Sequence, residues 1–267
     1  MNVLIIGAGN MGTTFGQSFI NASAISPAQL YFMDHQAVKA DLVSELSHHP
    51  LAFEATELTT EMDLIILAVK PQDFPELASK LKGHLEAHQL ILSIMAGLQV
   101  DAISEALGID KIVRAMPNLP AQIGRGMTVF TTSPSVTRLE IFTVQNLLNT
   151  TGKTLHTPSE PMIDAATAVS GSGPAFVYFF MSAMMEAARE MGFSDSEAQL
   201  LVRQTFSGSV SLLRQSNRSS DDWIAKVASR GGTTEAALAF WQQKDLKALI
   251  AQGLETARKR AEFLSGS

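Results

Sequence analysis

The chain has no cysteine and few charged residues. Without cysteine it forms no disulfide and offers no thiolate nucleophile, which fits a reducing compartment, and we expect a cytoplasmic location. Charged residues are 17% of its 267 residues and apolar ones 46%, whereas roughly 25% are charged in an average soluble domain. A chain so poor in charge predicts apolar surface that a second subunit covers.

Positive charge is also scarce, since 20 Lys and Arg face 26 Asp and Glu for a net charge of −6. Nucleic acids and anionic membranes need a basic face, so we expect neither as a partner. No apolar run approaches the ~20 residues of a membrane span. The start MNVLIIGAGN carries no cationic leader, so we expect no signal peptide. The six histidines show no metal-ligand spacing, and we expect no metal.

Short apolar runs are the main structural signal of the first part of the chain. They are continuous rather than alternating, which is typical of parallel strands buried on both faces. The runs are residues 3–6, 30–33, 64–69, 90–94 and 112–116, and residues 126–132 and 153–156 add strands around a helix near 136–150. Helical segments between the runs predict a doubly wound α/β domain.

The sequence pattern changes after Pro158, where the short apolar runs typical of strands end. From residue 161 to 265 no convincing strand is found, and segments rich in Ala, Met, Leu and Glu indicate helices throughout. We therefore predict a Rossmann-type domain with a mainly parallel sheet over residues 1–158, and an all-helical domain over 159–267.

A glycine fingerprint follows the first predicted strand. Gly7, Gly9 and Gly12 match G-x-G-x-x-G, and with Asn10 and Met11 they open an apolar helix. The first glycine permits the turn, the second admits a pyrophosphate, and the third lets helix and strand pack closely. This context predicts dinucleotide binding; the alternative is a glycine-rich turn without a ligand.

Asp34 bears on the choice of dinucleotide because it ends the second predicted strand, 22 residues after Gly12. A carboxylate there binds the 2′-hydroxyl of the adenosine ribose and repels a 2′-phosphate, which favours NADH over NADPH. The alternative is that Asp34 only caps the next helix. The cofactor is therefore NADPH or NADH, with Asp34 favouring NADH.

Ligands of such sheets bind beyond the carboxyl ends of the strands. Further cofactor-binding candidates lie there: Val69, Lys70, Pro71, Ala96, Gly97 and Asn118. Lys70 precedes a proline and is held extended, so its ammonium can lie near the cofactor ribose. Ala96-Gly97 leaves room for a flat nicotinamide, and Asn118 offers both a donor and an acceptor.

The stretch AVSGSGPAF, residues 168–176, lacks the G-x-S-x-G of a nucleophile turn and follows no strand. We interpret it as a helix junction. Gly171 and Gly173 break one helix, Ser172 or Gly173 caps the next, and Pro174 occupies its first turn.

Taken together, GAGNMG, LAVKPQ, SIMAGL, VRAMPNLP, TAVSGSGPAFVY and GGTT resemble the pyrroline-5-carboxylate reductase family. The resemblance implies reduction of the cyclic imine Δ1-pyrroline-5-carboxylate to L-proline with NADPH or NADH, the last step of proline biosynthesis. It also implies a homodimer through the helical domain, with further assembly open. In support, residues 174–191 are apolar nearly all round as a helix, which predicts burial on most sides.

The same resemblance assigns the substrate loop to Ser229, Gly231, Gly232, Thr233 and Thr234, and makes Thr234 the catalytic hydrogen-bonding or proton-donating residue at the imine nitrogen. From the residues alone, both threonines are ordinary helix caps. Two positions depart from the family pattern: Arg230 replaces a proline, and Ser216-Asn217-Arg218-Ser219 lacks an acidic residue followed by His-Pro.

Two other functions remain open at this point. One is a Rossmann oxidoreductase acting on another imine or on a β-hydroxyacid, although the helix after SGSGPA carries only Arg189 as a cation. The other is a dinucleotide-binding regulator without catalysis.

Overall fold

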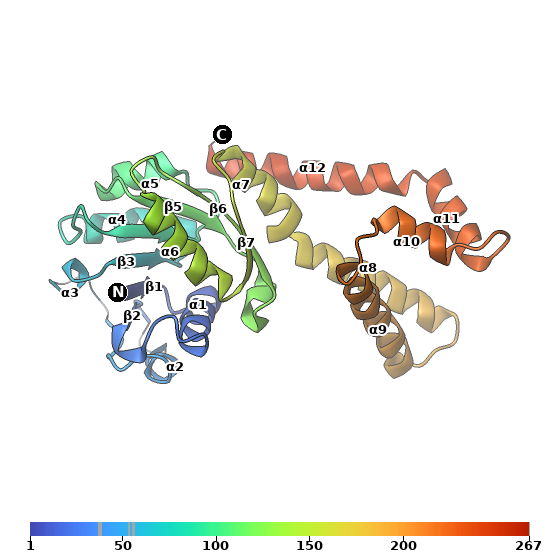
Figure 1. Cartoon of the computed structure of the whole chain (residues 1–267), viewed down its shortest axis with the longest axis horizontal. Coiled ribbons are helices and arrows are strands. Elements are labelled where there is room, and N and C mark those ends of the chain that lie inside the picture. Colours follow the sequence, from blue (N-terminus) through green and yellow to red (C-terminus); the bar gives the residue numbers. More distant parts are fainter. Residues whose placement is uncertain (37–38, 53, 55–56, 267) are drawn as a thin grey trace. The chain divides into compact units, whose positions relative to one another are not determined.

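One seven-stranded sheet forms the centre of the first part of the chain (Figure 1). The structure is a computed structural model that describes residues 1–36, 39–52, 54 and 57–266. The strands are β1 (Val3–Ile6), β2 (Leu30–Met33), β3 (Leu64–Leu67), β4 (Leu90–Ser93), β5 (Ile112–Met116), β6 (Gly126–Thr132) and β7 (Gly152–His156).

The strand order is β2-β1-β3-β4-β5-β6-β7. Every neighbouring pair is parallel except β5 and β6, which are antiparallel. All seven predicted strands are present, with β3 and β4 shorter than expected, and the Rossmann-type fold class is confirmed. The reversal between β1 and β3 creates the crevice in which dinucleotides bind in such sheets.

Helices cover both faces of the sheet, because alternate residues of each strand point to opposite sides. On one face, Val3 and Ile5 pack with Phe15 and Phe19 of helix α1 (Asn10–Asn21). On the other, Leu4 and Ile6 belong to the cluster that includes Phe74 of helix α4 (Phe74–Leu81). This double burial explains why the sequences of β1 and β3, VLII and LIIL, are apolar without a break.

The α-helices of the described residues are, in chain order, α1 (Asn10–Asn21), α2 (Ala40–Ser44), α3 (Glu57–Thr60), α4 (Phe74–Leu81), α5 (Val100–Leu107), α6 (Arg138–Asn149), α7 (Pro161–Ala166), α8 (Gly173–Glu190), α9 (Asp195–Arg214), α10 (Ser220–Val227), α11 (Thr233–Gln243) and α12 (Leu246–Ser265). Short 3-10 helices are η1 (Pro27–Gln29), η3 (Pro71–Asp73) and η4 (Leu119–Ile123). A π-helical turn, η5 (Thr167–Gly171), joins α7 to α8.

That π-turn corrects one prediction about AVSGSGPAF. We expected Gly171 and Gly173 to break the helix, but the backbone stays helical through Ser172, at φ −81° and ψ −18°. A Cβ atom on Gly171 would lie 2.8 Å from Cε of Met116, so this glycine makes room for a neighbour instead of ending the helix. The first turn of α8 does contain Pro174, as predicted.

The chain divides into two compact units: residues 1–174 with residues from 256 onward, and residues Ala175–Glu255. The boundary at 158 that we predict from composition stays a prediction. The first unit holds the sheet and both apolar clusters. The second unit is helical and has little core of its own. Among its described residues, all of Ala175–Glu255, only Ala198 and Val202 are buried hydrophobics.

Contrary to the expectation from the sequence, the helical run Pro161–Glu190 is long and apolar enough to cross a membrane by length and composition alone. Only 6% of its most apolar stretch is buried within this single chain. The same properties are typical of a helix at a subunit interface, so this finding by itself is weak evidence for a membrane span.

Candidate active site

The glycine fingerprint forms a tight turn between β1 and α1. Gly7 has φ +105°, and a Cβ atom there would lie 2.6 Å from the carbonyl oxygen of Ala68. On Gly12, a Cβ atom would lie 2.0 Å from the carbonyl oxygen of Gly7. Both positions therefore exclude any side chain, because real Cβ atoms do not approach backbone so closely.

Gly9 differs from these two glycines, since a Cβ atom there would meet nothing within 4 Å. It is the N-cap of α1, with extended backbone and no side chain to cap the helix. The first N–H groups of the helix, from Asn10 to Gly12, have no partner within the helix. An open surface with outward N–H groups and a positive helix end fits a pyrophosphate.

Asp34 is fixed beside this loop. Its Oδ2 atom accepts a hydrogen bond from the Ala8 N–H at 2.7 Å, and its Oδ1 atom accepts from the Gln36 N–H at 2.9 Å. The bond to Ala8 shapes the glycine loop itself, a role that the sequence did not indicate. The bond to Gln36 resembles the alternative capping role, although residues 37 and 38 lie outside the described residues. A carboxylate oxygen has two lone pairs, so both oxygens can still accept a ribose hydroxyl.

Gly7, Gly9 and Asp34 line a cavity of about 540 Å³. Val69 and Lys70 line it as well, so five of the predicted cofactor residues come together here. Lys70 has extended backbone, as its position before Pro71 predicts. The other predicted cofactor residues, Asn10, Met11, Gly12, Pro71, Ala96, Gly97 and Asn118, are not among those lining this cavity.

The cavity is also lined by titratable residues that the sequence alone does not single out: His35, Lys39, Glu54, Asp73, Glu76 and Lys80. Three of these residues could have been found from their spacing. Asp73, Glu76 and Lys80 are three and four residues apart, which places side chains on one face of a helix. Lys80 Nζ lies 2.6 Å from Glu76 Oε1. This hydrogen bond and the lysine charge hold the pKa of the Glu76 carboxyl below its usual value.

Two predicted residues lie on other loops at the carboxyl ends of the strands. Gly97 has φ +73°, and a Cβ atom there would lie 3.0 Å from the carbonyl oxygen of Leu264. Asn118 donates from Nδ2 to the Ser170 carbonyl at 2.9 Å and accepts at Oδ1 from the Met127 N–H at 2.9 Å. Its amide thus connects the β5 loop to the π-turn and to β6, with one N–H left for a ligand.

The predicted substrate loop precedes α11 in the second unit. Gly231 has φ +74°, and its N–H donates to Oε2 of Glu235 at 2.6 Å. The N-cap of α11 is Gly232 without a side-chain cap. The two threonines are therefore the first helical residues and not caps. Their N–H groups lack intrahelical acceptors and can bind an anion.

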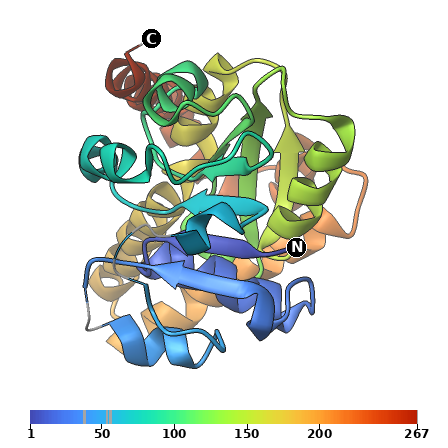
Figure 2. The same cartoon turned by 90° about the vertical axis from the view of Figure 1, so that its left-hand side faces the viewer.

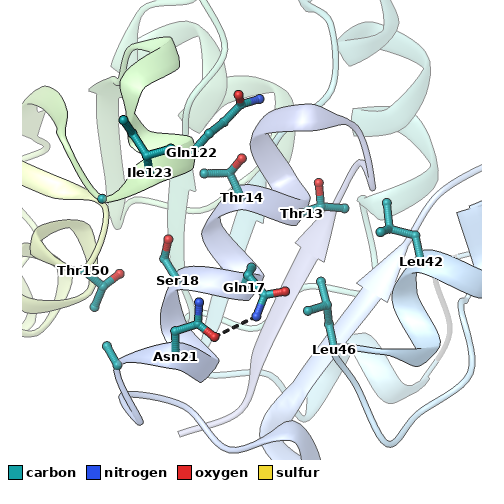
Figure 3. Close-up of a pocket in the computed structure, with 12 residues that line it drawn as sticks. Thr13, Thr14, Gln17, Ser18, Asn21, Leu42, Leu46, Gln122, Ile123 and Thr150 are labelled. Atoms are coloured by element: carbon teal, nitrogen blue, oxygen red, sulfur yellow. Dashed lines mark hydrogen bonds between the residues drawn. The ribbon is translucent and has the colours of Figure 1, made fainter.

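A second cavity of about 580 Å³ lies along α1 (Figure 3). Its lining residues are Thr13, Thr14, Gln17, Ser18, Asn21, Ala22, Leu42, Leu46, Gln122, Ile123, Gly124 and Thr150. None of these is charged, and several polar groups bond within the chain. Gln17 Nε2 donates to Asn21 Oδ1 at 2.8 Å, and Thr14 Oγ1 donates to the Asn10 carbonyl. The chemistry of this cavity gives no sign of a dinucleotide.

Among the described residues, no group of three or more His, Cys, Asp or Glu could hold a metal ion.

A doubly wound sheet with this glycine turn and an acidic residue after β2 is typical of nicotinamide dinucleotide-dependent oxidoreductases. Two family models agree: "NADP oxidoreductase coenzyme F420-dependent" matches residues 2–97, and "Pyrroline-5-carboxylate reductase dimerisation" matches residues 160–264. The chain belongs to the pyrroline-5-carboxylate reductase family. It is 34% identical over 265 residues to the reductase of Aquifex aeolicus, covering 99% of this chain and 97% of that one. The Escherichia coli reductase is 32% identical, with 98% and 97% covered.

Solved structures give the same result. A pyrroline-5-carboxylate reductase from Coxiella burnetii has a TM-score of 0.89 at 29% identity, covering 99% of this chain and 98% of that one. The Plasmodium falciparum enzyme, solved with NADP bound, has a TM-score of 0.86 at 26% identity, again covering 99% and 98%. The family resemblance is confirmed, and the dimerisation match supports homo-oligomerisation. The roles of the individual site residues stay predictions.

Proposed function

We propose that the protein reduces Δ1-pyrroline-5-carboxylate to L-proline, the last step of proline biosynthesis, with NADPH or NADH. The observation that carries this proposal is the match to pyrroline-5-carboxylate reductases over nearly the whole chain, together with the dinucleotide crevice. In the reaction, the reduced nicotinamide supplies a hydride to the imine carbon. The nitrogen gains a proton, and the C=N bond becomes CH–NH.

The chain's own residues have two tasks in this scheme. The glycine turn, Asp34 and Lys70 bind and orient the dinucleotide, and Gly97 and Asn118 border its nicotinamide end. The N–H groups that begin α11 bind the substrate carboxylate, and the Thr234 hydroxyl donates to the imine nitrogen. Within the described residues this hydroxyl has no hydrogen-bond partner, which leaves it available.

One assay separates this function from its alternatives. The purified protein is mixed with NADH or NADPH and pyrroline-5-carboxylate, and the loss of nicotinamide absorbance is followed. Turnover supports the proposal. Cofactor binding without turnover indicates a regulator, whereas turnover only with a piperideine carboxylate or a β-hydroxyacid indicates another substrate class.

We expect Asp34→Ser to shift the preference from NADH toward NADPH. The substitution removes a negative charge next to the ribose 2′ position, and Lys39 and Lys70 line the same cavity. Serine retains an acceptor for the Ala8 N–H, so the loop should keep its shape. The measurement is the ratio of kcat/KM for NADH to that for NADPH. An unchanged ratio would show that Asp34 does not sense the ribose.

We also infer that the protein is a cytoplasmic homodimer joined through its helical domain. Large apolar side chains of that domain are exposed in the single chain: Phe179 of α8 is 70% exposed and Met191, just after α8, is 78% exposed. Large apolar side chains that are exposed together on one part of a protein mark an interaction surface. The "dimerisation" match over residues 160–264 supports a second copy as the partner.

Phe179→Glu should convert the dimer into monomers at micromolar concentration, because it would bury a charge at the interface. Dinucleotide affinity should persist, since the cofactor residues belong to the first unit, while turnover is lost. Light scattering and fluorescence titration measure the two effects. Leu139→Glu is the matched control: Leu139 is 75% exposed but lies on α6, outside the dimerisation match. A dimeric, active Phe179→Glu protein would contradict the proposed interface.

A further inference from the structure

A buried ion cluster lies against β5. Arg114 is only 1% exposed, although it stands in the middle of the strand. Its Nη1 atom donates to Oε1 of Glu160 at 2.8 Å, and Nη2 donates to Oδ1 of Asp164 at 2.7 Å. The same Glu160 oxygen accepts from the Val100 N–H that begins α5. Buried charges are tolerated only when paired in this way, so the cluster holds α5, α7 and β5 in one arrangement.

The C-terminal end of α12 is part of this arrangement. The Ser265 hydroxyl lies 3.1 Å from Oδ2 of Asp164 and 3.0 Å from the Glu262 carbonyl oxygen, so its single proton is shared between these two acceptors, and Ser265 is itself buried. The Leu264 carbonyl lies against Gly97, at the position where a Cβ atom would be only 3.0 Å away. Figures 1 and 2 both show this end of the helix beside α5 and α7. The last turn of the chain thus contacts a loop predicted to border the nicotinamide.

The helix that carries Asp164 is also connected to the other bordering loop. It continues into the π-turn, where the Ser170 carbonyl accepts from Asn118 at 2.9 Å. Met116, at the end of β5, fills the space beside Gly171. Arg114, Met116 and Asn118 therefore anchor successive parts of one helical segment from a single strand and its loop.

We propose that the C-terminal tip, residues 264 and 265, held by the Arg114–Asp164–Ser265 cluster, positions the Gly97 loop and so the nicotinamide end of the dinucleotide site. The inference rests on the proposed dinucleotide-dependent function. Leu264 and Ser265 are positioning residues, because they act through Gly97 and Asp164 and do not touch the reacting atoms.

The test compares a ligand that has a nicotinamide with one that lacks it. NADH or NADPH and ADP-ribose (its 2′-phosphate if NADPH binds more tightly) are titrated against the full chain, Ser265→Ala, and a chain ending at Phe263. Ser265→Ala keeps the Arg114–Asp164 pair intact. Ser265→Thr restores the hydroxyl, and Lys247→Ala, an exposed residue at the other end of α12, is the control.

We expect Ser265→Ala to raise the Kd of the nicotinamide dinucleotide about fivefold, the ratio set by one ordinary hydrogen bond. The chain ending at Phe263 should lose more affinity for the nicotinamide dinucleotide than Ser265→Ala does, and Ser265→Thr should bind it as tightly as the full chain. The Kd of ADP-ribose should stay unchanged in all of these proteins. Equal weakening of both ligands, or no weakening in the shortened chain, overturns the proposal. These titrations need no turnover, so a wild-type protein that binds NADH but reduces no imine refutes the proposed function alone.

Discussion

Gly12→Ala should weaken dinucleotide binding by about two orders of magnitude. The new Cβ atom would lie 2.0 Å from the Gly7 carbonyl oxygen, which belongs to backbone and has no rotamer with which to escape. The turn must open to admit it. Overpacking of this kind costs up to about 3 kcal/mol, and 1.4 kcal/mol is tenfold in affinity, so we expect a loss of about 100-fold. Fluorescence titration with NADH and NADPH measures it.

Gly9→Ala separates strain in the turn from occupation of the phosphate site. With φ −80° and nothing within 4 Å of a new Cβ atom, the ligand-free fold has room for alanine. Its stability should therefore be unchanged or rise by up to about 1 kcal/mol, because alanine restricts the unfolded chain. Dinucleotide affinity should still fall, since the methyl group occupies the approach of the pyrophosphate. Unfolding is measured at one protein concentration because the protein oligomerises. Wild-type affinity in Gly12→Ala, or in Gly9→Ala, would contradict the predicted phosphate site.

Thr234→Val should lower kcat by up to ~10²-fold, the low end of general-acid effects, because water can replace a missing hydroxyl. Valine keeps the shape of threonine and has a similar helix propensity, so α11 should persist. In the proposed site, backbone N–H groups hold the substrate carboxylate, so the KM for the substrate should change less than kcat. Steady-state kinetics with saturating cofactor measure both constants.

Thr234→Ser completes this test by restoring a hydroxyl without the methyl group. The kcat of Thr234→Ser should therefore be close to that of the unchanged protein. Dinucleotide affinity should be unchanged in both variants, since the predicted cofactor residues belong to the other compact unit. An unchanged kcat in Thr234→Val would assign Thr234 a structural role at the start of α11.

Local patterns were sufficient for most of the fold. The strands β1, β3 and β4 are buried on both faces, so their apolar runs appear directly in the sequence, as in residues 3–6 and 64–67. The glycine turn was equally clear, because Gly7 and Gly12 meet backbone from neighbouring segments and tolerate no side chain. Asp34 was found from its distance to this turn, although its bond to the Ala8 N–H was not.

Local sequence patterns did not predict the contacts between distant parts of the chain. Arg114 stands in an apolar strand sequence, and its partners Glu160 and Asp164 follow 46 and 50 residues later. Asn118 was predicted from its chemistry, yet its amide also bonds to Ser170, 52 residues away. The π-turn depends on such partners as well, because Met116 and Asn118 stabilise a segment that glycines alone would interrupt.

By itself, the sequence determined the class of the fold, the dinucleotide turn and the family, since all three rest on local periodicity or on short motifs. The tertiary structure alone decided what surrounds these motifs. Asp34 shapes the glycine loop, and the cavity beside it contains Glu76 and Lys80. The last turn of the chain lies against Gly97. The physical reason is that burial of a charge or a close backbone approach depends on which distant segments meet, and hydrophobic periodicity carries no information about that.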